Sequence, residues 1–198
     1  GKGKTDFIQE LEKAFFFFDG ALVESGRRNP AWGTTHFKLI ELPDKTHPGQ
    51  WTQKYQKRIE QAEKEQLRFE QIRRELTEAR QEALRNRYTL DIYEQNNHLQ
   101  NYPVRLLLAL RDLDKAAGEE NRLKALDHLE TVCNDFYAMR RELEAVYSRT
   151  RFMEQPDGYI PDMNHHNHLS AKSNNSDWLY LYEKPMVEKI LSYIGEKY

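Results

Sequence analysis

The stretch from Trp51 to Gln100 constrains the fold of this chain most, because it contains neither glycine nor proline. Strong helix formers dominate it. At a rise of about 1.5 Å per residue, one unbroken helix over this stretch would be about 75 Å long. That length far exceeds the width of a compact domain of this size. We therefore predict either one long helix that bends or breaks near residues 86–88 or a helix that projects from the body of the domain.

Apolar residues recur at steps of three and four along this stretch and along two segments that follow it. Such spacing is typical of helix faces that pack against one another. Tyr102-Pro103 is expected to end or kink the first helix, and Gly118 to stop the second. A third helix is expected from Glu119 to Arg149. The inward positions are Phe69, Ile72, Leu76, Ala79 and Ala83, then Leu106, Leu110 and Leu113, then Leu129, Val132, Phe136, Met139, Leu143 and Val146.

The beginning of the chain predicts another helix, with Thr5 as its cap and an end near Ser25-Gly26. Its apolar stripe is formed by Ile8, Leu11, Phe15, Phe18 and Leu22. Phe16 and Phe17 fall outside this stripe, because successive residues turn by about 100° on a helix. These two side chains are candidate interface residues, and we expect a homodimer through this helix or through an exposed helical seam.

Prolines and glycines make residues 26–50 an irregular excursion, with a minor strand expected over 36–42. Trp32 and Trp51 are expected to anchor this excursion to the bundle. A second irregular segment, a long loop at 151–176, precedes a last helix from about Trp178 to Tyr198. The fold class is therefore an all-α antiparallel helical bundle. One domain is expected overall, with an N-terminal part at 1–50 and the bundle at 51–198.

The loop "PDMNHHNHLSAKSNNSDW" (161–178) contains three histidines within four residues. His165, His166 and His168, with Asp162, could supply ligands to a zinc ion that keeps one position open for water. Loop histidines lack the fixed geometry of an HExxH helix, and no glutamate base lies beside them. We therefore favour a structural tether, in which His165, His166, His168 and Trp178 fasten the loop to the bundle. No cofactor is expected.

Charge and cysteine content narrow the choice of partners. Thirty lysines and arginines balance 32 acids, for a net charge of −2, and both signs are mixed along the same helices. This pattern does not favour nucleic acid or an anionic membrane as partner. Cys133 is the only cysteine and is expected to be a small buried thiol on a helix. No apolar run approaches the roughly 18 residues that a membrane span needs.

Several short blocks resemble the C-terminal helical region of some bacterial hexosaminidases of glycoside hydrolase family 20, particularly those from Bacteroidetes. They are "RRNPAWG" (27–33), "IELPDKTHPGQW" (40–51), "YPVRLLLALRDL" (102–113), "LEAVYSRTR" (143–151) and "YIPDMNHHNHLSAKSNNSDW" (159–178). The resemblance implies a parent exo-enzyme that removes terminal N-acetylhexosamines. This region would follow the catalytic barrel in the same polypeptide and support or dimerise it. A periplasmic or exported location is implied too.

The chain departs from that family in its chemistry. The family uses adjacent Asp and Glu, whereas no Asp here is followed by Glu. No run of eight alternating strands and helices could form a barrel. We therefore expect a noncatalytic accessory or dimerisation domain, with no catalytic residue to assign. Two alternatives are a helical interaction module unrelated to sugars and a small metal-dependent hydrolase that uses His165, His166 and His168.

Overall fold

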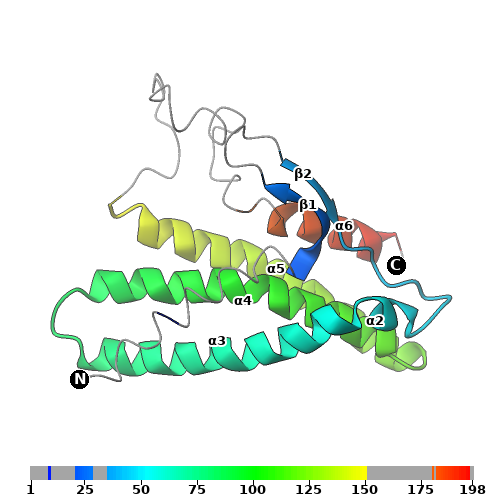
Figure 1. Ribbon diagram of the computed structural model, residues 1–198, viewed down its shortest axis with the longest axis horizontal. Helices are drawn as coiled ribbons and strands as arrows, with labels where there is room; N and C mark the ends of the chain where they lie inside the picture. The colour runs from blue at the N-terminus through cyan, green and yellow to red at the C-terminus, as the bar shows by residue number, and fades with distance from the viewer. Residues whose placement is uncertain (1–8, 10–20, 29–34, 151–179, 181, 197–198) are drawn as a thin grey trace, which may run out of the picture.

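The computed structural model describes residues 9, 21–28, 35–150, 180 and 182–196, and it is mostly helical. Three long helices lie side by side in Figure 1: α3 (Gln56–Glu82), α4 (Arg87–Lys115) and α5 (Glu119–Tyr147). A short α2 (Gln50–Lys54) precedes α3, and α6 (Glu183–Gly195) packs against α5. The predicted all-α bundle is therefore confirmed. None of the described helices is long and apolar enough to cross a membrane.

The long helical stretch predicted from residue 51 is divided near the predicted position, residues 86–88. Helix α3 ends at Glu82, and α4 begins at Arg87 after a short turn. The turn closes at Asn86, whose φ of 58° lies in the left-handed region that asparagine tolerates better than most residues. The chain thus reverses direction, and α3 and α4 pack as an antiparallel pair (Figure 1).

Two predicted helix ends are wrong. Tyr102-Pro103 does not end the helix, because Pro103 lies inside α4, which continues to Lys115; the alternative, a kink at Pro103, stays a prediction. A proline in a helix interior costs roughly 3 kcal/mol, but Pro103 is buried where α4 is covered by its neighbours, and this packing outweighs the lost hydrogen bond. Gly118 does not stop the second helix either. It is the N-cap of α5, with a φ of 78°, and its carbonyl accepts from Arg122 N at 3.1 Å.

The predicted inward faces form the core. All the large side chains named for α3, α4 and α5 are buried, and Ala79 is partly buried. Phe136 lies at the centre, with its ring centroid 5.5 Å from that of Tyr102 and 5.4 Å from that of Tyr180. Cys133 is buried beside it, which confirms the expected thiol in the core. Burial raises the pKa of Cys133 to about 12.

Ion pairs close the end of the bundle at the α3–α4 turn. The carboxylate of Asp91 on α4 is largely buried and lies 2.9 Å from Arg80 of α3 and 3.0 Å from Arg149, just beyond α5. One residue therefore links three helices. Further along α4, the buried side chain of Asn97 donates to the carbonyl of Phe69 at 3.2 Å. Polar contacts thus add to the aliphatic packing of residues such as Leu76 and Leu143 at this end.

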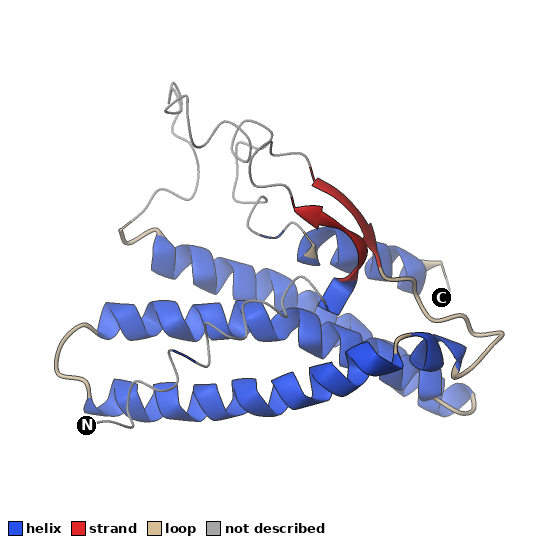
Figure 2. Cartoon of the chain, viewed as in Figure 1, coloured by secondary structure: helices blue, strands red, loops and turns tan. Residues whose placement is uncertain are grey.

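The helix predicted over residues 5–25 is wrong at its end. Among the described residues after position 20, the helix includes Ala21 and Leu22 and then ends. Strand β1 (Val23–Arg28) follows directly. It pairs antiparallel with β2 (Thr35–Leu39), close to the strand expected over 36–42. Cross-strand pairing overrides the helical spacing here. The hairpin lies beside α6 in Figure 2, where Lys189 Nζ donates to Ile40 O at 2.9 Å.

Trp51 is buried and anchors the excursion as expected. Its Nε1 donates to the carbonyl of Glu41 at 2.7 Å. The other proposed anchor, Trp32, lies outside the described residues. The last helix, α6, begins at Glu183 instead of near Trp178, which is also outside the described residues.

Asp114 supplies the cap that α2 lacks in its own sequence. Gly49 is the N-cap and has no side chain, so Asp114 Oδ2 accepts from Thr52 N at 2.8 Å. We predict that Asp114→Ala lowers the free energy of unfolding by about 1–2 kcal/mol, measured by urea denaturation. Asp112→Ala is the matched control, since exposed Asp112 pairs only with Arg111; it should change stability by at most about 0.5 kcal/mol. Equal losses in both variants would contradict the capping role.

Candidate functional site

The candidate site lies where the hairpin meets α2 and α3. Five side chains converge there, and we call them the junction cluster: Glu24, Lys38, Glu41, Lys54 and Tyr55. Glu24 comes from β1, Lys38 from β2 and Glu41 from the segment after β2. Lys54 ends α2, and Tyr55 separates α2 from α3. Segments about 30 residues apart thus supply one site.

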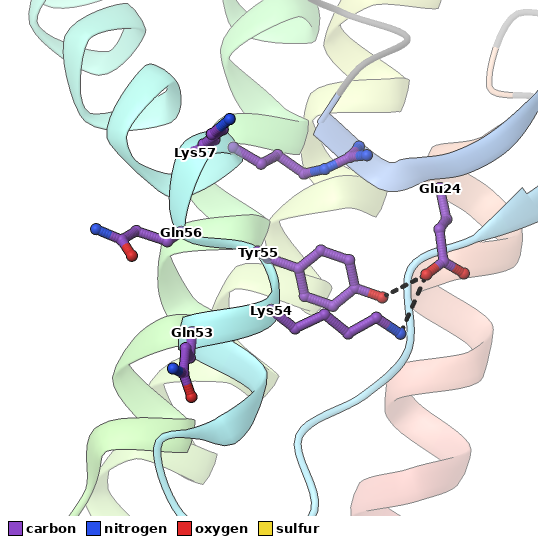
Figure 3. A pocket seen from close by; sticks show the side chains of 7 residues that line it. Glu24, Gln53, Lys54, Tyr55, Gln56 and Lys57 are labelled. Atoms are coloured by element: carbon purple, nitrogen blue, oxygen red, sulfur yellow. Dashed lines mark hydrogen bonds and ion pairs between the residues drawn. The ribbon is translucent and has the colours of Figure 1, made fainter.

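A β-bulge places Glu24. Val23 pairs with Leu39, but the next pair is Ser25 with Lys38, so Glu24 is an extra residue on β1. A bulge bends its strand and changes the direction in which a side chain points. Figure 3 shows Glu24 directed toward Tyr55 and Lys54 across the junction. The bulge therefore brings a carboxylate of the hairpin to the helices.

A break between two helices places the residues on the other side. Tyr55 has φ −104° and ψ 15°, which interrupts the helical path for one residue. This break between α2 and α3 lets Lys54 and Tyr55 reach toward the hairpin (Figure 3). Tyr55 is only 5% exposed, so its hydroxyl must find hydrogen-bond partners inside the junction.

The cluster is a closed network of hydrogen bonds and ion pairs. Tyr55 donates to Glu24 Oε1 at 3.2 Å and accepts from Glu41 N at 3.1 Å. Lys54 Nζ lies 3.1 Å from Glu24 and 2.7 Å from Glu41. Lys38 Nζ lies 2.7 Å from Glu24 and 3.5 Å from Glu41. Each ammonium group thus contacts both carboxylates.

This network holds all four charged groups in their ionised forms. The hydrogen bonds from Lys38 and then Lys54 lower the pKa of Glu24 to about 2. The pKa of Glu41 is lowered, chiefly by Lys54. In return Glu24 raises the pKa of Lys38, and Glu41 and Glu24 raise that of Lys54. These two carboxylates and two ammonium groups therefore keep their charges at neutral pH.

A surface pocket of about 490 Å³ opens at the helix break. Cations lie on the ring of Tyr55, with Lys54 Nζ 5.1 Å and Arg58 Cζ 5.9 Å from its centroid. Arg58 also donates to the carbonyl of Val23 at 2.8 Å. Both cations thereby join the helices to the hairpin. The pocket is lined by Glu24, Gln53, Lys54, Tyr55, Gln56, Lys57 and Arg58.

The residues singled out from the sequence fall outside the part of the chain that the structure describes. Candidate ligands and tether residues Asp162, His165, His166, His168 and Trp178, and the interface candidates Phe16 and Phe17, are all outside the described residues. Both interpretations of the histidine loop therefore stay predictions. Within the described ranges, no group of three or more His, Cys, Asp or Glu side chains could hold a metal ion.

Sequence reasoning missed the junction cluster because it assigned Glu24 to the end of a helix. The cluster depends on the pairing of β1 with β2, and one sequence carries no direct signal of strand register. Gly26, at the predicted end of the helix, is the one local signal against a helix here, since glycine disfavours helix interiors. Glycine is equally common where a helix stops, so this signal does not identify a strand.

Comparison with known proteins adds no family. No protein-family model, curated protein or solved structure matches this chain. The resemblance to hexosaminidases therefore rests on the sequence blocks alone.

The lowered pKa of Glu24 predicts a loss of stability in acid. Its folded value of about 2 lies below the ordinary value of 4.5, so its contribution is present above about pH 4.5 and is lost as the pH falls toward 2. We predict that Glu24→Gln loses less stability than the wild type over this range, measured by urea denaturation at each pH.

Glu78→Gln is the matched control for Glu24→Gln. Glu78 is an exposed residue of α3, distant along the chain from the junction. Its variant should keep the wild-type dependence on pH. If Glu24→Gln also keeps that dependence, the ion pairs at the junction contribute nothing to acid stability.

Proposed function

We propose that this chain is a noncatalytic helical accessory domain that packs against another domain of its own polypeptide or against a second copy. The sequence resemblance supports a parent β-N-acetylhexosaminidase of glycoside hydrolase family 20, with its catalytic barrel in the same polypeptide. The domain itself would support or dimerise that enzyme and would not turn over substrate.

One observation carries this proposal: the perturbed acids and thiol in the described part of the chain are shifted away from neutrality. A general acid or base works best with a pKa near the working pH. Hydrogen bonds and ion pairs lower the pKa of Glu24 and Glu41, whereas burial raises that of Cys133 to about 12. Burial also raises the pKa of Tyr102 and Tyr180. These directions suit structural contacts and oppose catalysis.

The basic groups with lowered pKa values also have structural contacts. Burial lowers the pKa of Lys189 and Arg58. Each donates to a backbone carbonyl of the hairpin region, Lys189 to Ile40 and Arg58 to Val23. Both side chains thereby fasten the hairpin to helices. Such use of charge supports an assembly role.

The absence of catalysis is tested by assaying the purified 198-residue chain against aryl N-acetyl-β-glucosaminides. We predict no turnover above a buffer blank, because the adjacent Asp-Glu pair of the resembling family has no counterpart here. A preparation of Glu24→Gln, made in the same way, controls for contaminating enzymes. Turnover that persists through repeated purification of the wild type would overturn the proposal.

The homodimer is tested by sedimentation or light scattering. We predict a mass of twice 23.7 kDa for the wild type. Replacing both Phe16 and Phe17 by Ser should shift the chain toward the monomer, because it removes the apolar side chains proposed to lie at the interface. Replacing Leu84, which is 95% exposed at the α3–α4 turn, by Ser is the matched control. A wild type that is monomeric at all concentrations would contradict the dimer.

A further inference from the structure

Helix α4 has two halves of different character. Before Tyr102 its buried residues are all polar, whereas those from Tyr102 to Leu113 are apolar or aromatic. The polar ones are Asp91, Gln95 and Asn97. They lie toward the end of the bundle that carries the α3–α4 turn (Figure 1). We call this region the turn-side end, and it comprises residues 70–82, 87–101 and 139–147.

The polar half of α4 buries oxygen atoms that have no hydrogen-bond partner. They are the side-chain amide oxygens of Gln95, Asn97, Gln100 and Asn101. A buried acceptor without a partner costs the free energy of its removal from water. Gln95 is 8% exposed, and neither its amide oxygen nor its amide nitrogen has a partner in the described part of the chain. Opening of the turn-side end would return these oxygens to water.

Pro103 separates the two halves of α4. Proline has no backbone N–H, so the carbonyl of Leu99 lacks the hydrogen bond that it would otherwise accept from position 103. Sharp bends of helices are found at prolines for this reason. The backbone of α4 is therefore weakest where its polar half meets its apolar half.

The ion pairs across the turn-side end involve partly exposed side chains. Arg80 lies 2.9 Å from Asp91, and Arg149 lies 3.0 Å from the same carboxylate. The two arginine side chains are 51% and 55% exposed. Water and salt weaken such pairs. Leu76 and Leu143 are buried at this end, so the closed form still has an apolar contribution to its stability.

We infer that the turn-side end opens as one unit, hinged at Pro103, while the half of the bundle around Phe136 stays folded. Local opening of this kind has a lower free energy than unfolding of the whole chain. The closed and opened bundles are then two conformations, and a partner that binds one of them more tightly shifts the balance between them. This inference concerns the described helices and does not depend on the accessory role.

Native-state hydrogen exchange of the full 198-residue chain, followed by NMR in urea below the unfolding transition, tests the opening. We expect the amides of residues 76–82, 92–101 and 141–147 to share one free energy of opening and one dependence on urea. The amides of residues 104–113 should exchange at least about tenfold more slowly, the effect of a single buried acceptor without a partner. Equal protection in the two halves of α4, or fast exchange confined to α4, would overturn the inference.

Gln95→Met is the decisive variant, because it replaces a buried amide without partners by an unbranched apolar side chain. It should slow exchange of residues 92–101 about tenfold and leave residues 104–113 unchanged. Gln81→Met is the matched control, since Gln81 is an exposed glutamine of α3 at the same end. Its exchange should be that of the wild type. If Gln95→Met slows exchange no more than Gln81→Met does, the buried amide is not the cause and the inference fails.

A second variant tests the hinge. Pro103→Ala restores the N–H that the carbonyl of Leu99 can accept. It should reduce the difference in exchange rate between residues 92–101 and 104–113, and circular dichroism should first establish that the variant is folded. An unchanged difference in a folded variant would remove Pro103 as the hinge and contradict the inference in that form. If the variant does not fold, the comparison of Gln95→Met with Gln81→Met still decides.

Discussion

The structure depends on one helix that must be covered on two sides. Along α4, the residues Val104 and Leu106–Leu110 are all buried, although successive positions point in different directions around the helix. A helix that is apolar nearly all round is stable only between neighbours. Helices α3 and α5 supply those neighbours on opposite sides of α4 (Figure 1). The same cover explains why Pro103 is tolerated inside α4, since packing of its turn replaces the missing hydrogen bond.

The bundle is not uniform along its length. The half around Phe136 is aliphatic and aromatic, whereas the half near the α3–α4 turn adds the ion pairs of Asp91 with Arg80 and Arg149 to buried side chains such as Leu76 and Leu143. A largely buried ion pair contributes little net stability, because removal of the charges from water costs about as much as their attraction returns. The geometry of the triad nevertheless favours one arrangement of the helices over others. Because the carboxylate of Asp91 on α4 has one partner within α3, Arg80, and one just beyond α5, Arg149, the triad suits setting the alignment of the three helices.

The local parts of this fold could be predicted from sequence, and the nonlocal parts could not. Spacing of three and four identified the buried side chains of α5, and the length limit located the break at Asn86. Both predictions depend only on residues that are close together in the sequence. The hairpin depends on pairing between Val23–Arg28 and Thr35–Leu39, and its bulge decides where Glu24 points. A residue such as Gly118 is equally compatible with a helix stop and a helix start, and only the surrounding structure decides.

The hairpin is docked by side chains that come from several elements. A two-stranded hairpin is marginally stable by itself, so its attachment through Glu24, Lys189 and Arg58 is a condition for its order. Arg58 is bonded to Val23 while it lines the pocket. The order of this surface element therefore comes from the helices that it contacts, more than from its own two strands.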